Sequence, residues 1–138
     1  IAMYKNILVP TFLDDKETLK TAVAAARLML SPNGKITLLN VVEEVPMYVE
    51  TYVPTDMLAA NVTDVLRVLD EVAATLGDDL QTRAVKGHAG RTILTEAETI
   101  GADLVVISSH RPGLADYFLG STAGHVVRHA VCPVLVLR

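Results

Sequence analysis

The sequence predicts an α/β fold in which helices cover both faces of a parallel, Rossmann-like β-sheet. Short apolar segments rich in β-branched residues alternate along the chain with segments that repeat apolar residues at helical spacing. At 138 residues the chain is long enough to bury a core without a disulfide or a metal. Aromatic residues make up only 4% of it, which suits helices packed closely on a sheet. We therefore expect a single domain over residues 1–138.

Five segments are predicted as strands. The fourth, ADLVVISS (102–109), is apolar almost throughout, which is typical of a strand covered on both faces. The third, LQTRAVK (80–86), is less apolar and is expected at an edge of the sheet. The predicted strands span residues 5–11, 35–42, 80–86, 102–109 and 133–137.

Four segments between these strands are predicted as helices, over residues 14–30, 55–76, 91–101 and 121–130. The first opens with Asp14 and Glu17 at capping-box spacing, and SPNG (31–34) is expected to end it, with Gly34 supplying a permissive backbone. GHAG (87–90) is expected to be a turn. The residues expected on the buried face of the last helix are Ala123, Val126, Val127 and Ala130.

Charge and cysteine content narrow the class of protein. The formal net charge of −4 and the absence of a basic run argue against a nucleic-acid or membrane partner. The longest apolar run, residues 130–137, is too short to span a bilayer. The single cysteine, Cys132, cannot form an intrachain disulfide and is expected to be a packed small side chain rather than a reactive thiol. These features predict a soluble, cytoplasmic protein.

Candidate ligand-binding residues follow the strands, because an open parallel sheet binds ligands beyond the carboxyl ends of its strands. The free N–H groups at the start of the last helix favour an anion near Gly120, Ser121 and Thr122. A serine or threonine there is also a common helix N-cap, so both interpretations stay open. Likewise, His110 and Arg111 either contact a phosphate or form a solvated turn.

Several kinds of site are excluded because the sequence lacks their known motifs. Neither G-x-x-x-x-G-K-[ST] nor G-x-G-x-x-G occurs in the sequence. One cysteine and four dispersed histidines do not make a zinc site, and Asp14 and Asp15 are better explained as a helix cap than as metal ligands. We therefore expect no resident metal site and no catalytic residue that the sequence alone identifies.

Three segments together resemble the universal stress protein family: KNILVP (5–10), ADLVVISSH (102–110) and GSTAGHVVRHAVCPVLVLR (120–138). HRP (110–112) resembles the family's F- and G-type branch of small single-domain bacterial members. The resemblance covers residues 4–138. It implies an adenine-nucleotide alpha hydrolase-like sheet in the order 3-2-1-4-5, and ATP, ADP or AMP as ligand, with Mg²⁺ as a possible companion.

The chain departs from the family's phosphate-binding pattern, G-x-x-G followed later by G-[ST]. Only the second half matches, at Gly120-Ser121, while the first glycine falls at Ser108 and the second near Arg111. Ser108 and Ser109 are expected to present backbone amides and hydroxyls in place of the glycine, and Arg111 adds a charge.

A second departure lies just after the first strand, where the family carries an acidic residue and this chain has Phe12. The phenyl ring either stacks on a base or fills the pocket. The resemblance also maps the family's adenine-contacting backbone to Val41 and its turn after the third strand to Gly87-His88.

The resemblance implies a nucleotide-binding protein with a regulatory role in the stress response. The predicted nucleotide-binding residues are Pro10, Thr11, Phe12, Val41, Gly87, His88, Ser108, Ser109, His110, Arg111, Gly120, Ser121 and Thr122. Two alternatives stay open. One is slow ATP hydrolysis or self-phosphorylation at Ser121 or Thr122, with His110 or Asp116 as base. The other is a ligand-free dimeric interaction module whose cleft is closed by Phe12.

The last strand predicts self-association. PVLVL (133–137) is apolar and terminal, and an exposed apolar strand edge invites aggregation unless something covers it. Pairing with the same strand of a second chain removes that hazard. We therefore expect a homodimer formed through residues 132–138.

Overall fold

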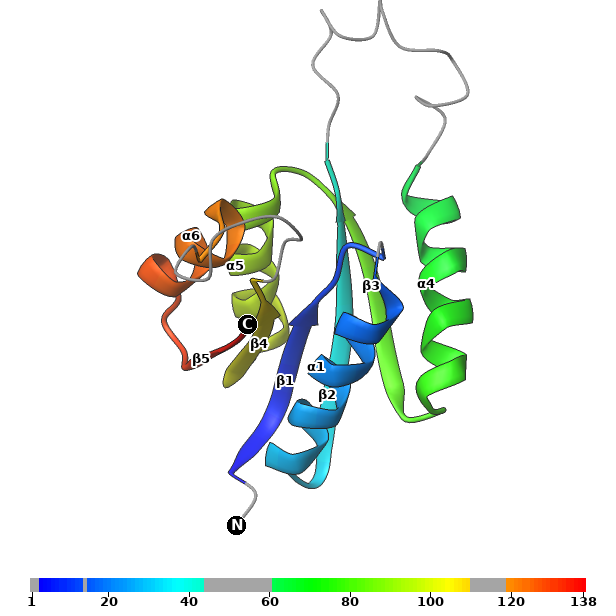
Figure 1. Cartoon of the computed structure of the whole chain (residues 1–138), viewed down its shortest axis with the longest axis horizontal. Helices are drawn as coiled ribbons and strands as arrows, with labels where there is room; N and C mark the ends of the chain where they lie inside the picture. Colours follow the sequence, from blue (N-terminus) through cyan, green and yellow to red (C-terminus); the bar gives the residue numbers. More distant parts are fainter. Residues whose placement is uncertain (1–2, 14, 44–60, 110–118) are drawn as a thin grey trace, which may run out of the picture.

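The computed structural model describes residues 3–13, 15–43, 61–109 and 119–138, and these form an α/β domain around one parallel sheet (Figure 1). The sheet has five strands in the order β3-β2-β1-β4-β5, and every neighbouring pair is parallel. This confirms the predicted fold class and strand order. The strands are β1 (Tyr4–Pro10), β2 (Leu30–Val42), β3 (Leu80–Lys86), β4 (Leu104–Ser108) and β5 (Val134–Leu137).

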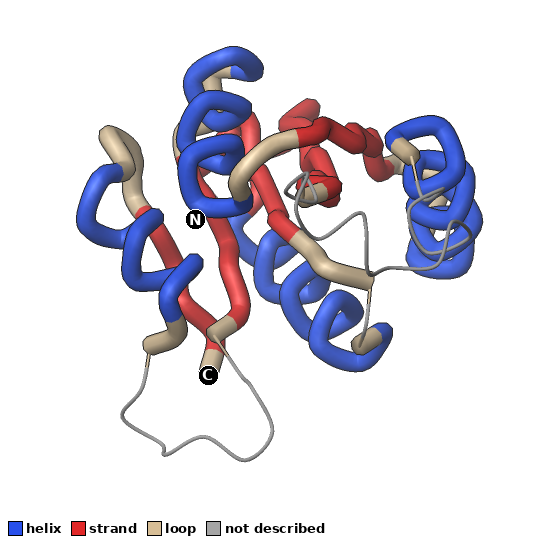
Figure 2. The backbone as a smooth tube through the Cα atoms, turned by 90° about the horizontal axis from the view of Figure 1, so that it is seen from above, coloured by secondary structure: helices blue, strands red, loops and turns tan. Residues whose placement is uncertain are grey.

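Helices cover both faces of the sheet, as predicted (Figure 2). They are α1 (Lys16–Met29), α4 (Val62–Leu76), α5 (Ala89–Ile100) and α6 (Ser121–His129). Buried residues of α1 and α4 share one core cluster, and those of α5 and α6 share the other. The second helix does not begin at residue 55 as predicted: α4 begins at Val62, and its N-cap Asn61 has an extended backbone. Residues 44–60 lie outside the described residues.

Successive side chains of the inner strands point to opposite faces of the sheet, and this divides the core into the two clusters. In β1, Ile7 and Val9 face α1 and α4, whereas Leu8 faces α5 and α6, because successive side chains of a strand point to opposite faces. All three are fully buried. β4 is buried from Leu104 to Ile107, which confirms that it is covered on both faces. β3 pairs only with β2, which confirms its edge position.

The start of α1 differs from the prediction. The N-cap is Asp15, whose carboxylate accepts hydrogen bonds from the backbone N–H of Glu17 and Thr18, at 3.0 and 3.2 Å, and from the Thr18 hydroxyl at 2.6 Å. The predicted box with Asp14 as cap is therefore wrong by one residue, and Asp14 itself lies outside the described residues. With two adjacent aspartates, the sequence could not decide which one caps the helix.

The connection from α1 to β2 also differs. β2 begins at Leu30, directly after the helix, and its pairing with β1 shifts between Leu30 and Lys35. The residue with a left-handed backbone is Asn33, with a φ of 66°, and not the predicted Gly34. Gly34 is needed for space, because a Cβ there would lie 2.5 Å from a methyl carbon of Leu30.

Two predictions on the α5–α6 side are corrected. GHAG is not wholly a turn, because Ala89 and Gly90 form the buried first residues of α5. Val127 is 43% exposed, although the helical pattern placed it on the buried face. The inward face of α6 is set by Ala123 and Val126. Cys132 is half-buried against the α5–α6 core, and burial raises the pKa of its thiol, in agreement with a packed side chain.

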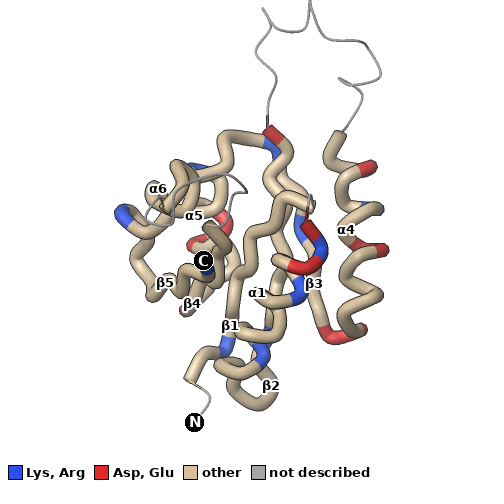
Figure 3. The backbone as a smooth tube through the Cα atoms, in the orientation of Figure 1, with Lys and Arg blue, Asp and Glu red and all other residues tan. Residues whose placement is uncertain are grey.

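Three arginines are matched with carboxylates across the fold. Arg27 of α1 donates to Asp79 at 2.7 Å and to the Leu76 carbonyl at 2.8 Å, so it ties α1 to the end of α4. Its hydrogen bond lowers the pKa of the Asp79 carboxyl. Arg67 pairs with Glu71 along α4, and Arg83 of β3 pairs with the buried Glu96 of α5. Figure 3 shows how the charged positions are distributed over the backbone.

Candidate functional site

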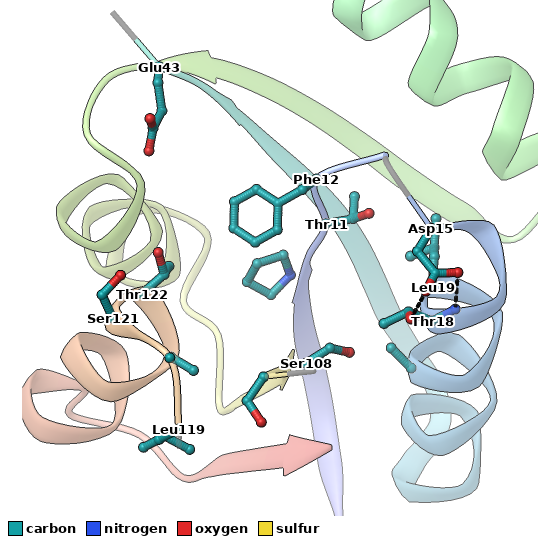
Figure 4. A pocket seen from close by; sticks show the side chains of 15 residues that line it. Thr11, Phe12, Asp15, Thr18, Leu19, Glu43, Ser108, Leu119, Ser121 and Thr122 are labelled. Atoms are coloured by element: carbon teal, nitrogen blue, oxygen red, sulfur yellow. Dashed lines mark hydrogen bonds between the residues drawn. The ribbon is translucent and has the colours of Figure 1, made fainter. Parts of the chain in front are cut away.

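A cavity of about 700 Å³ opens between the starts of α1 and α6, beyond the carboxyl ends of β1 and β4 (Figure 4). This is the position that parallel-sheet topology predicts for a ligand site. It is lined by Pro10, Thr11, Phe12, Asp15, Thr18, Leu19, Ala22, Glu43, Ser108, Ser109, Leu119, Gly120, Ser121, Thr122 and Ala123. Its volume lies within the range of small-molecule sites, roughly 300–1,000 Å³.

The wall formed by the end of β1 is held in place by backbone hydrogen bonds. The N–H of Thr11 donates to the Leu39 carbonyl at 2.8 Å, and the buried Asn40 side chain donates to the Thr11 carbonyl at 3.0 Å. The Thr11 hydroxyl accepts from the N–H of Leu13 at 3.3 Å, and Leu13 has a left-handed φ of 64°. These contacts fix the backbone on both sides of Phe12.

Phe12 projects from this fixed segment into the cavity, toward the wall that carries Ser121 and Thr122 (Figure 4). Its side chain is 45% exposed, an unusual exposure for a phenyl ring. The cavity remains open with the ring in place, so Phe12 lines the cleft without closing it.

The start of α6 forms the opposite wall. Gly120 occupies the N-cap position with φ 84° and ψ 150°, a backbone conformation that a side chain would strain. No side chain caps the helix, so the serine and threonine are not its N-cap. Among the described residues, neither the Ser121 nor the Thr122 hydroxyl has a hydrogen-bond partner. Free N–H groups and hydroxyls therefore border the cavity at the positive end of a helix dipole.

The end of β4 contributes two serines in different states. The N–H and the hydroxyl of Ser109 both donate to the Leu137 carbonyl, at 2.9 and 3.4 Å, so these groups hold β5 in place. Ser108 lines the cavity, and no hydrogen bond joins its hydroxyl to the described part of the chain. Of the two predicted hydroxyls, the one at Ser108 is thus better placed for a ligand.

Several predicted residues do not line this cavity. Val41 is buried in the core beneath α5 and α6. The N–H of Gly87 donates to the Val42 carbonyl at 3.0 Å, and His88 is the exposed N-cap of α5. His110 and Arg111, together with the alternative base Asp116, lie outside the described residues.

Sequence reasoning missed the α1 side of the cavity. Asp15, Thr18 and Leu19 line it because α1 starts directly beside the end of β1 (Figure 4). Glu43 follows β2 and Leu119 precedes α6. The available signal was position alone: Asp15 and Glu43 come soon after predicted strand ends, where any polar residue is a candidate.

The described residues contain neither a metal-binding cluster nor a membrane-spanning helix. No three side chains of the histidine, cysteine, aspartate and glutamate types lie close enough together there to hold a metal ion. Within the same residues, no helix has the length and apolar character needed to cross a membrane.

Comparison with known proteins places this geometry in a family. The universal stress protein family model matches residues 3–138. The chain is 33% identical to universal stress protein G of Escherichia coli O157:H7, over 99% of this chain and 100% of that one. The structure of universal stress protein UspA from Lactobacillus plantarum superposes with a TM-score of 0.73 at 27% identity, over 100% of both chains.

A more distant structure, of a universal stress protein in complex with cAMP, has a TM-score of 0.64 at 22% identity and covers 99% of this chain and 98% of its own. At that identity the likeness establishes the shared fold. The sequence match over nearly the whole chain, together with the sheet order 3-2-1-4-5, confirms the expected relationship. The chain belongs to the universal stress protein family.

Proposed function

We propose that this protein binds an adenine nucleotide, ATP, ADP or AMP, in the cavity between α1 and α6, and acts as a regulatory nucleotide-binding protein in the stress response. One observation carries the proposal: at the start of α6 the Ser121 and Thr122 hydroxyls, which have no hydrogen-bond partner among the described residues, border a cavity of about 700 Å³. Such a helix end attracts phosphate through its free N–H groups and its dipole. A protein of the same fold is known in complex with cAMP, which is consistent with this ligand class.

Each wall has a role in the proposed complex. Gly120, Ser121 and Thr122 hold the phosphates, and the Ser108 hydroxyl donates to the ribose or to a phosphate. Pro10, Thr11 and Phe12 border the base and sugar. Ser109 supports the wall through β5. Of the remaining predicted contacts, Val41, Gly87 and His88 do not line the cavity. His110 and Arg111 lie outside the described residues.

The direct test is calorimetric titration of the purified protein with ATP, ADP and AMP, each with and without Mg²⁺. Mass spectrometry of the denatured protein checks whether a nucleotide co-purifies. We expect saturable binding of at least one adenine nucleotide. The proposal would be contradicted if millimolar nucleotide gave no heat of binding and no nucleotide co-purified with the protein.

Phe12 separates two modes of binding. If its ring stacks on the base, Phe12→Ala should weaken ATP binding by roughly tenfold, since a base–aromatic stack contributes about 1–3 kcal/mol. Phe12→Tyr should keep the affinity. If the ring instead obstructs the site, Phe12→Ala should bind ATP more tightly than the parent.

Tripolyphosphate is the control ligand for this comparison, because it has no base to stack. Its affinity should be the same for the parent and for Phe12→Ala. A parallel loss of tripolyphosphate and ATP binding would show that the substitution has disturbed the phosphate-binding wall, and would contradict a role in stacking.

We also propose that the protein is a homodimer paired through residues 132–138. β5 has β4 as its only strand partner in the described sheet, and all its residues are only half-buried. Val131, just before it, is 85% exposed. Light scattering at tens of micromolar, an estimate for an interface of standard size, should give the dimer mass; a monomer mass there contradicts the pairing.

A further inference from the structure

A cluster of five basic and imidazole side chains lies over the start of α5 and the second half of α6. We call it the basic patch, and its members are His88, Arg91, His125, Arg128 and His129. All are exposed except His125, which is half-buried. None of them lines the cavity proposed to hold the nucleotide. The patch is therefore a separate surface.

Packing between the two helices holds His125 at the centre of the patch. A Cβ at Gly90 would lie 2.8 Å from Cδ2 of His125, so the absence of a side chain at position 90 lets the imidazole lie on the first turn of α5. On its other side the ring centroid of His129 lies 4.6 Å away, with the two rings tilted by 48°. The patch thus has a fixed imidazole at its centre, held by residues from both helices.

The electrostatic environment of His125 comes from groups of one sign. Partial burial lowers the pKa of its imidazole, and positive charge on the surrounding side chains lowers it further. Those side chains are His88 and Arg91 from α5, and Arg128 and His129 from α6. No carboxylate in the described residues contributes. Residues 119–138 contain no aspartate or glutamate, although the whole chain is net acidic.

The two arginines of the patch differ from the three arginines of the fold that pair with carboxylates. Arg27, Arg67 and Arg83 each pair with a carboxylate. Arg91 and Arg128 have no ion pair or side-chain hydrogen bond within the described residues. In addition, Arg91 lies in the first turn of α5, where the positive end of the helix dipole disfavours a cation and no acid is present. A bound anion would relieve this repulsion.

From these observations we infer that the basic patch binds an acidic segment of a partner protein, and binds it more tightly as the pH falls. The patch places two permanent positive charges, from Arg91 and Arg128, beside three imidazoles, so it matches a short run of carboxylates. A long polyanion such as nucleic acid would extend beyond the patch and meet the rest of a chain whose net charge is −4. This favours an acidic peptide over nucleic acid.

The direction of the pH effect follows from the imidazoles. A histidine gains its positive charge between about pH 8 and 5, whereas glutamates stay ionised down to about pH 4.3. In the free protein the lowered pKa of His125 means that the folded state takes up this proton less readily than the unfolded state. The folded protein is therefore most stable, as far as His125 is concerned, above the unfolded-state pKa of 6.5. This contribution to stability is lost as the pH falls through the lower pKa of the folded state. A bound acidic segment reverses this, because it favours the charged ring.

The test measures binding of fluorescein-labelled octaglutamate to the full chain by fluorescence anisotropy. We expect affinity about tenfold higher near pH 5.5 than near pH 7.5, and weaker binding in salt that shortens the Debye length to about 8 Å. Arg91→Glu with Arg128→Glu should abolish binding. If the charge reversal unfolds the protein, the milder double substitution Arg91→Gln with Arg128→Gln takes its place and should weaken octaglutamate binding. His125→Gln should keep binding near pH 7.5 and flatten the pH dependence.

The matched control is Lys16→Glu with Lys20→Glu, which makes the same change in net charge on the exposed face of α1. It should bind octaglutamate nearly as the parent does. Equal loss in the control and the patch variant, or no binding by the parent near pH 5.5, would overturn the inference. Tighter binding of a thymidine octanucleotide than of octaglutamate would overturn it in favour of a nucleic-acid partner.

Discussion

Ser121→Glu is expected to lower the affinity for ATP by more than about 100-fold while leaving the protein at least as stable as the parent. A carboxylate about 4 Å from a phosphate repels it by roughly 4 kcal/mol at the effective dielectric constant of a protein surface. The same carboxylate in the first turn of α6 interacts favourably with the helix dipole, by about 0.3–1 kcal/mol. Binding and stability should therefore change in opposite directions.

Calorimetric titration measures the first effect and thermal unfolding measures the second. Ser121→Gln introduces a side chain of the same size as glutamate but without charge. Its affinity for ATP should fall only about tenfold, as expected for the loss of one hydrogen bond to a charged group. Ala24→Glu adds the same charge on the exposed face of α1 and should bind ATP as the parent does. If Ser121→Glu binds ATP normally, the phosphates do not lie at the start of α6.

The largest effect on stability is expected for Leu8→Ala, at about 2–5 kcal/mol of unfolding free energy. Leu8 is fully buried in β1, where it pairs with Thr37 of β2 and Val105 of β4 and packs in the core beneath α5 and α6. Truncation removes apolar contacts on an inner strand, where neighbouring strands on both sides limit collapse into the space.

Leu28→Ala is the matched control, because the substitution is the same but Leu28 is 84% exposed on α1. Its unfolding free energy should stay within about 0.5 kcal/mol of the parent. Guanidinium unfolding measures both variants, and an unchanged slope shows that the native and unfolded states keep their compactness. Equal losses in the two variants would contradict the assignment of Leu8 to the core.

The order of strands and helices could be predicted from the sequence because apolar residues on the buried face of an element recur at that element's period. Leu19, Ala22, Val23 and Ala26 recur at helical spacing in the sequence, and all four are buried in α1. Val127 is an apolar residue that helical periodicity placed wrongly. Its neighbour Val126 is fully buried, and a helical step of about 100° between adjacent residues was enough to leave Val127 exposed.

Helix ends and turns were predicted less well, since neighbouring residues there compete for one role. Asp15 rather than Asp14 caps α1, and Asn33 rather than Gly34 adopts the left-handed backbone. In the first case the competing side chains are identical, and in the second both residue types tolerate a left-handed backbone. The contacts that decide between them, such as the Leu30 side chain against Gly34, come from packing.

The candidate site was predicted at the ends of β1 and β4 and at the start of α6, but not on α1 or after β2. The residues proposed to bind phosphate, Gly120 to Thr122, are contiguous, and helix-start chemistry can be predicted from such a local run. Asp15, Thr18 and Glu43 reach the same cavity from two other elements. Their contribution depends on which strand ends lie side by side, and a local pattern carries no record of that.

By itself, the sequence determined the alternation of strands and helices, the burial of β4 and the edge position of β3. These properties depend on residues close together in the chain, where hydrophobic periodicity and backbone chemistry operate. Only the tertiary structure decided that Phe12 faces Ser121 across an open cavity, and that His88 and Arg91 join His125, Arg128 and His129 in one patch. The physical reason is that these groups meet through the packing of elements distant in sequence, which sets their spacing and their shared electrostatic field.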